Sequence, residues 1–168
     1  MKWGSIAVCL CAFFFLVPLQ CYIIGNDMGV GIQGAVYRFQ ITPQGNSLIP
    51  LTSDLGYVIS GTYAGKTAFS VIFWILGTLL LAGITMIPLV EGNRLTPRHL
   101  RIIIAGLAGA AVGYFVSCIF QYGLFFSGPA GSSLPAGVIL MIVVAAGLYT
   151  YRDFFFPEDI VRGSNTQT

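Results

Sequence analysis

Charged side chains are scarce throughout this sequence. Its 168 residues include eight Lys or Arg and six Asp or Glu, so that 8% are charged, whereas 56% are hydrophobic. Water-soluble domains carry about a quarter charged residues, and this shortage excludes an ordinary soluble fold. A net charge of +2 from so few side chains also excludes the basic surface that nucleic-acid binding requires. We therefore expect a protein whose solvent is the lipid bilayer.

Residues that carry out catalysis or bind cofactors are also scarce. His99 is the only histidine, and the interiors of the long apolar runs contain no Asp, Glu, Lys or Arg. A membrane haem site needs paired His ligands, and metal sites or proton relays at membrane depth need His or carboxylates. Residues 61–67 are similar to a phosphate-binding loop but one residue short of it, because Ser60 stands where its first Gly would be. We predict no enzyme activity and no catalytic, cofactor, metal or nucleotide site.

Four apolar runs are each long enough to cross a hydrocarbon core, which needs about 20 helical residues. Thr96 and Pro97 mark a helix start just before the third run, since Thr caps helices and Pro suits their first turn. The predicted fold class is an all-α integral membrane protein with four transmembrane helices in a single domain, residues 1–156, and a polar cytoplasmic tail, residues 157–168. The four runs cover residues 5–24, 67–90, 101–126 and 135–151.

The basic residues predict the orientation of the four helices. Cytoplasmic loops carry an excess of Lys and Arg, and the two sides of a chain that crosses four times hold unequal numbers of them. Both termini are therefore predicted to be cytoplasmic, in a multi-pass protein of the plasma membrane. The first run also resembles a secretory signal, but no small-residue cleavage site follows it, which favours an uncleaved signal anchor over a cleaved signal. The cytoplasmic side holds Lys2, Arg94, Arg98, Arg101, Arg152 and Arg162, and the outer side holds Arg38 and Lys66.

Residues 25–66 form the one segment between helices that is large enough to fold outside the membrane. From residue 35 to 42, apolar side chains occupy every second position, which is the period of a strand with one apolar face. A turn follows, and residues 48–52 and 57–63 are two further β-prone runs. We expect a small antiparallel β segment in this first outer loop, packed against the helix bundle or another protein, and a short turn between the third and fourth helices.

This order of elements resembles the layout of claudin-like tetraspan proteins, which combine four helices with a β-bearing first outer loop and a short second loop. The motif that marks those proteins, a Trp followed by Gly-Leu-Trp and two spaced cysteines, does not occur in residues 25–66. The resemblance therefore implies a topology only, and it assigns no residue role and no activity.

Small residues on the third predicted helix are candidates for close packing. Ala105, Gly109 and Gly113 follow the small-xxx-small spacing that lets two helix backbones approach each other in lipid. Such a face serves either an interface with another protein or the packing of the helix against its own neighbours. The sequence leaves both alternatives open.

Two other groups of residues are candidates for specific contacts. Cys21 and Cys118 are both expected near the outer membrane boundary, where they form a candidate disulfide between the first and third helices. Arg94, Arg98 and Arg101 concentrate positive charge at the cytoplasmic turn. They either hold an anionic lipid headgroup or only fix the topology.

These patterns predict a function by association. We expect a non-enzymatic membrane protein that serves as a structural, accessory or assembly subunit, in contact with the bilayer and with other subunits or further copies of itself. The alternative is an oligomeric channel or carrier for a small neutral solute. A third hypothesis is a lipid-binding or lipid-modifying protein, whose catalytic residues would have to come from the loop residues Asp27, Asp54 and Glu91.

Overall fold

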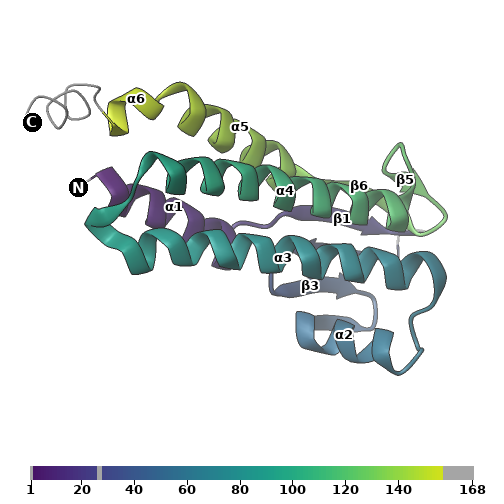
Figure 1. Cartoon of the computed structure of the whole chain (residues 1–168). Helices are drawn as coiled ribbons and strands as arrows, with labels where there is room; N and C mark the ends of the chain where they lie inside the picture. The colour runs from purple at the N-terminus through teal and green to yellow at the C-terminus, as the bar shows by residue number, and fades with distance from the viewer. Residues whose placement is uncertain (1, 26–27, 157–168) are drawn as a thin grey trace, which may run out of the picture.

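A computed structural model describes residues 2–25 and 28–156 of the chain. The predicted polar tail, with Arg162, and the loop residue Asp27 lie outside these residues. The longer helices are α1 (Lys2–Phe15), α3 (Gly65–Glu91), α4 (Pro97–Tyr122) and α5 (Ala136–Thr150), and the short ones are α2 (Leu51–Ile59), the 3-10 helix η2 (Gly92–Arg94) and α6 (Arg152–Phe155). Together with a β-sheet, they form an elongated molecule in which α3 and α4 run its whole length (Figure 1).

Two long antiparallel helices, α3 and α4, form the centre of the fold. α3 has 27 residues and α4 has 26, and both are long and apolar enough to cross a membrane. The apolar helices α1 and α5 are shorter, with 14 and 15 residues, and accompany only the half of the pair near the chain ends (Figure 1). Leu81, Ile103, Leu107 and Met141 are fully buried where these helices meet.

The start of α4 follows the predicted capping chemistry. Thr96 Oγ1 accepts a hydrogen bond from the His99 backbone N–H at 3.3 Å, and His99 Nδ1 accepts one from the Thr96 N–H at 3.4 Å. Pro97 occupies the first turn, where its missing N–H leaves no bond unmade. The prediction of a Thr cap followed by Pro is confirmed, and α4 begins four residues before the apolar run that marks it in the sequence.

The sheet lies beside the other half of the helix pair. Its six strands are antiparallel and follow the order β4-β3-β2-β1-β6-β5. They run along the helix axes, next to the ends of α3 and α4 that α1 and α5 leave uncovered (Figure 1). The strands are β1 (Gln20–Ile24), β2 (Gly29–Gln33), β3 (Tyr37–Thr42), β4 (Gly45–Pro50), β5 (Ser127–Gly128) and β6 (Gly131–Leu134).

The first predicted membrane helix, residues 5–24, is wrong in its second half. Helix α1 ends at Phe15, and the chain continues as strand β1. Pro18 cannot donate a helical hydrogen bond, and the next residue, Leu19, is held by the sheet and α5 instead. Its N–H donates to the Gln33 carbonyl at 2.8 Å, and its carbonyl accepts from the Gly137 N–H at 2.9 Å.

The sheet is also larger than the predicted β segment. The strand expected at 35–42 is confirmed as β3 at 37–42, whereas β4 covers 45–50, which includes three residues of the expected turn and only the first part of the β-prone run 48–52. Strand β1 comes from the apolar run that precedes residue 25. The expected turn between the third and fourth helices supplies β5 and β6. The predicted strand at 57–63 is wrong, because helix α2 occupies residues 51–59 and begins directly after Pro50. The predicted all-α description therefore omits a six-stranded sheet, whose strands come from residues 20–50 and 127–134.

Candidate interaction surface

The two faces of the sheet have opposite character. One face consists of two rows of side chains that run across the strands, and it points away from the helices. Val30 is 50% exposed and Leu134 is 60% exposed on this face. The inner row, nearer the middle of the molecule, is Leu134, Cys21, Ile32, Phe39 and Leu48, and the outer row is Ser132, Ile23, Val30, Ile41 and Asn46.

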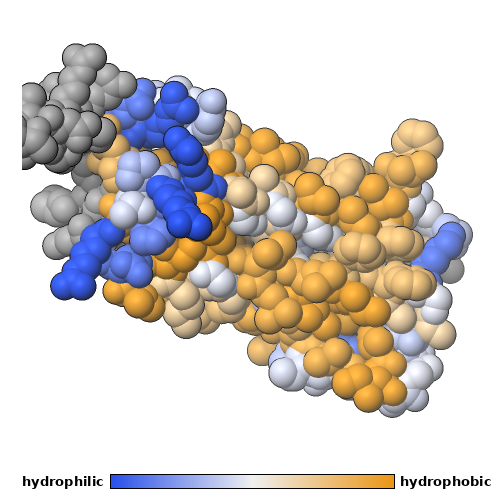
Figure 2. Space-filling view, in the orientation of Figure 1, coloured by the Kyte–Doolittle hydropathy of each residue, from blue (hydrophilic) through white to orange (hydrophobic). Residues whose placement is uncertain are grey.

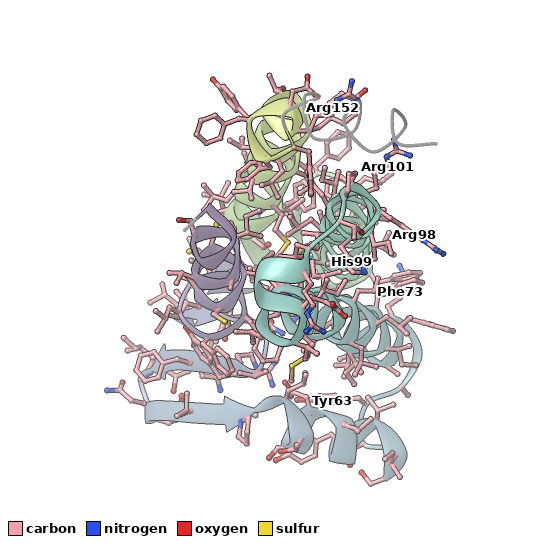
Figure 3. All side chains as sticks on the ribbon, turned by 60° about the vertical axis from the view of Figure 1, so that its left-hand side comes forward. Tyr63, Phe73, Arg98, His99, Arg101 and Arg152 are labelled. Atoms are coloured by element: carbon pink, nitrogen blue, oxygen red, sulfur yellow. The ribbon has the colours of Figure 1, made fainter. Side chains whose placement is uncertain are left out.

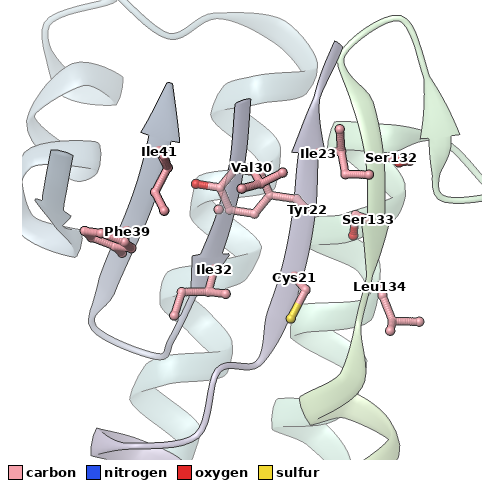
Figure 4. Close-up of a pocket in the computed structure, with 11 residues that line it drawn as sticks. Cys21, Tyr22, Ile23, Val30, Ile32, Phe39, Ile41, Ser132, Ser133 and Leu134 are labelled. Carbon is pink, nitrogen blue, oxygen red and sulfur yellow. The ribbon is translucent and has the colours of Figure 1, made fainter. Parts of the chain in front are cut away.

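This apolar outer face contains a shallow groove. The groove has a volume of about 630 Å³ and is lined mainly by apolar side chains of β1, β2, β3 and β6. Figure 4 shows Phe39 and Ile41 at one side of it, Leu134 at the other, and Ile32 with Cys21 between them. Among the described residues, no charged side chain lines the groove.

The opposite face of the sheet points toward the helices and is polar. Gln20 Nε2 donates to Ser133 Oγ at 3.0 Å. The Tyr22 ring lies over Gly31, where a side chain would leave no room for it. The centre of the same ring is 6.5 Å from the centre of the Tyr122 ring on α4. An antiparallel sheet in water places its apolar face on the core and its polar face in solvent. This sheet has the reverse arrangement.

An ion pair is buried on this inner face. Arg38 Nη2 of β3 donates to Asp54 Oδ1 of α2 at 2.6 Å, and the two side chains are 15% and 3% exposed. The same nitrogen donates to Tyr63 Oη at 3.3 Å. The pair therefore ties β3 to the segment that precedes α3.

Side chains of α3 hold the turn between β2 and β3. Trp74 Nε1 donates to the Gly34 carbonyl at 3.2 Å, and Thr78 Oγ1 donates to the Ala35 carbonyl at 2.8 Å. The next carbonyl, of Val36, accepts from the Leu51 N–H at 2.9 Å. Three successive carbonyl groups at this end of the sheet are thus satisfied without water.

We expect Thr78→Val to lower the free energy of unfolding by about 1 to 3 kcal/mol, because it leaves the buried Ala35 carbonyl without its donor and the buried Tyr114 hydroxyl without its partner. Thr85→Val is the matched control. Thr85 is also buried on α3, but its hydroxyl bonds only to the Leu81 carbonyl of its own helix, at 2.7 Å. Unfolding in detergent by increasing SDS would compare the two variants. Equal losses would show that the bond to the sheet contributes nothing.

Strand β4 is an edge of the sheet. In the described part of the chain, it pairs with β3 alone. Leu48 on this strand is 67% exposed, and Ile59 on the following helix α2 is 77% exposed. We call β4 together with the exposed apolar residues of α2 the β4 edge surface. Its exposed side chains on α2 are Leu55, Tyr57 and Ile59.

The headgroup site expected from three arginines remains a prediction. Arg94, Arg98 and Arg101 are all exposed at the end of the molecule where α4 begins. Figure 3 shows Arg98 pointing away from the helices. Arg101 lines a 370 Å³ pocket together with Arg152, which the sequence did not suggest because Arg152 lies beyond the end of the fourth predicted helix.

The small residues of α4 mostly face α3 of the same chain. A Cβ atom at position 113 would lie 3.2 Å from the Gly77 Cα, and a Cβ atom at position 109 would lie 3.3 Å from Leu80 Cδ1. Ala105 is exposed. Packing within the chain therefore accounts for the spacing at Gly109 and Gly113, and those two positions are not open to a second protein.

The candidate disulfide is not formed, because Cys21 and Cys118 are both free thiols. Strand alternation turns Cys21 to the outer face, where it lines the groove, whereas its neighbours Gln20 and Tyr22 point toward the helices. Cys118 is buried on α4. Because the prediction treated residue 21 as part of a helix, it could not include this alternation.

Sequence reasoning missed the most distinctive features of this surface. The alternation at 35–42 indicates which residues share a face, but not that the apolar face points outward. Asp54 gave no signal as the partner of Arg38, because its segment was expected to be loop or strand.

Among the described residues, no three His, Cys, Asp or Glu side chains are grouped closely enough to hold a metal ion. In comparison with known proteins, the chain matches no family model and no curated sequence.

Proposed function

We propose that this chain is a multi-pass integral membrane protein that acts by association, as a structural, accessory or assembly subunit of a membrane complex. Its helices cross the plasma membrane with both termini in the cytoplasm, and its contact with other subunits is the β4 edge surface. No enzymatic step is part of this function.

The distribution of charge supports a membrane location. α3 carries no charged residue between Lys66 and Glu91, which are about 38 Å apart along the helix, and α4 carries none from Arg101 to its end at Tyr122, about 32 Å away. On the face that Figure 2 shows, hydrophilic residues gather toward the two ends of the molecule, and hydrophobic residues cover most of the surface between them. We call these uncharged stretches of α3 and α4 the charge-free band. Its length is that of a hydrocarbon core of about 30 Å.

The observation that carries the association is the open edge of β4 beside this band. The inner end of β4 lies near Thr78, because Leu51, which follows Pro50, bonds to Val36 beside the Ala35 carbonyl that Thr78 holds. An unpaired strand edge offers backbone donors and acceptors to another chain, and lipid cannot satisfy them. A strand or loop of another subunit would satisfy them and cover Leu48 and Ile59 as well.

We expect Leu48→Pro to abolish the association while leaving the fold intact. The β3–β4 hairpin closes on Thr42 and Gly45, and bonded pairs alternate along an antiparallel ladder, so the N–H of Leu48 points away from β3. Proline removes this donor without breaking the internal ladder. Leu48→Val is the matched control, because it keeps both the N–H and an apolar side chain.

The measurement is gentle solubilisation of tagged chains from their native membrane, followed by size determination and identification of the proteins that elute with them. A defined assembly with the parent chain and Leu48→Val, but a monomer with Leu48→Pro, is the expected result. If the parent chain elutes alone, or if Leu48→Pro remains in the same assembly, the β4 edge surface is not the contact.

A further inference from the structure

Helices α1 and α5 are too short to cross a hydrocarbon core by themselves. At 1.5 Å per residue, they measure about 21 Å and 22 Å, against a core of about 30 Å. Both helices fall short on the same side of the hydrocarbon core. α1 continues after four residues into β1, and β6 leads after one residue into α5. Strands therefore extend both helices over the missing distance.

The depth of the sheet can be placed along α3. Thr78, which bonds to the turn between β2 and β3, is 13 residues from the end of α3 at Glu91, or about 20 Å. That is near the middle of the charge-free band. The six residues of β3 extend about 20 Å from there toward Lys66. These contacts therefore place the strands beside the outer half of the charge-free band.

The sheet becomes more polar from its inner end to its outer end. The inner row of the apolar face consists of apolar side chains only, whereas the outer row is flanked by Ser132 and Asn46. Beyond it, the turn between β3 and β4 exposes Gln44. At the inner end, Gly34, Ala35 and Val36 are apolar and their carbonyls are hydrogen-bonded. This gradient matches the change from hydrocarbon to headgroups in an outer leaflet.

We propose that the apolar face of the sheet lies in the outer leaflet of the membrane and that lipid acyl chains occupy its groove. The inference rests on the proposed membrane location but not on the proposed association, because the acyl chains occupy the groove on β1, β2, β3 and β6, and the other subunit covers β4 together with Leu48. The polar face is turned toward the helices, where Gln20 Nε2 and Arg38 Nη2 donate hydrogen bonds away from lipid, while Gln20 Oε1 and Arg38 Nε are buried without a partner among the described residues. The charges of Arg38 and Asp54 are tolerated at this depth because they are paired and buried.

Quenching of tryptophan fluorescence by brominated acyl chains tests this proposal. Three single tryptophans are introduced in turn into the full chain: Phe39→Trp in the inner row, Leu140→Trp on the exposed side of α5, and Gln44→Trp at the outer turn. Each purified variant is reconstituted into phosphatidylcholine vesicles with and without bromine on the acyl chains, and the emission of the parent chain is subtracted. Acrylamide serves as a quencher from water.

We expect bromine to quench Phe39→Trp about as strongly as Leu140→Trp, with Gln44→Trp quenched mainly by acrylamide. If Leu140→Trp is quenched by bromine but Phe39→Trp is quenched by acrylamide, the sheet stands in water and the proposal fails. If neither quencher reaches Phe39→Trp, protein covers the face, and the proposal also fails. If bromine does not quench Leu140→Trp either, the membrane location itself is wrong.

Discussion

Replacing Asp54 with leucine should lower the free energy of unfolding by about 3 to 5 kcal/mol. The substitution leaves the Arg38 guanidinium buried without its counter-charge, and breaking one partner of a buried ion pair carries a penalty of this size. Arg38 is only 15% exposed and cannot regain water without moving β3. Its remaining contact with Tyr63, at 3.3 Å, involves a neutral hydroxyl and does not replace the carboxylate.

The double variant Arg38→Met with Asp54→Leu separates the cost of the stranded charge from that of lost packing. We expect it to recover most of the stability that Asp54→Leu loses, since two apolar side chains of similar volume often replace a buried pair without penalty. SDS-induced unfolding in mixed micelles, followed by circular dichroism, would measure all variants. A double variant as unstable as the single one would mean that the charge itself contributes little.

Replacing Gly113 with leucine should lower the free energy of unfolding by about 3 kcal/mol or more, near the upper end of the range for overpacked sites. A side chain at this position meets backbone atoms, because its first carbon would lie 3.2 Å from both the Gly77 Cα and the Phe73 carbonyl oxygen. Backbone cannot rotate away as a side chain can. The helices α3 and α4 must therefore separate, and the buried ring of Tyr114 beside Gly77 loses its packing.

Gly83→Leu on α3 is the matched control for Gly113→Leu. Nothing lies within 4 Å of a side chain carbon built at Gly83, so leucine there should be neutral or stabilise the helix by up to about 1 kcal/mol. The same SDS titration compares the two. If Gly113→Leu is tolerated as well as Gly83→Leu, the helices do not approach as closely as the structure places them.

The long helices could be predicted from the sequence because their signals are local. α3 spans residues 65–91 where 67–90 was expected, and α5 spans 136–150 where 135–151 was expected. Each is a continuous apolar run with its own boundary residues. The capping pair Thr96 and Pro97 marks the start of α4 more accurately than hydropathy does.

The sheet could be predicted only in part because its pairing is not local. The run 5–24 is apolar throughout, and hydropathy cannot distinguish a buried strand from the continuation of a helix. β1 is recognised as a strand only through its partners β2 and β6, and β6 comes more than a hundred residues later. The short strand β5 has two residues and no periodicity to detect.

The candidate surface depends on which face of each strand points toward the helices, and the sequence of a single strand does not encode this. Alternation at residues 37–42 groups Phe39 with Ile41 and Arg38 with Gln40. Which group faces the helices is decided by Asp54 and Tyr63, whose positions follow from the path of the chain through α2. The ordinary expectation that the apolar group packs inward fails here, because Arg38 of the sheet meets Asp54 and Tyr63 instead.

Pairing between β1 and β6 also has a consequence for the order in which the protein can assemble. Gln20 and its partner Ser133 are separated by 113 residues, which a ribosome needs roughly 5 to 25 s to add. During that interval β1 to β4 can form a hairpin array, but β1 remains an open edge, and α5 has not yet been made. The nascent chain therefore passes through a stage in which both β1 and β4 are unpaired edges. The β1 edge is covered only when β6, in the segment between α4 and α5, pairs with it. A chaperone or insertion factor that shields β1 would act in this window.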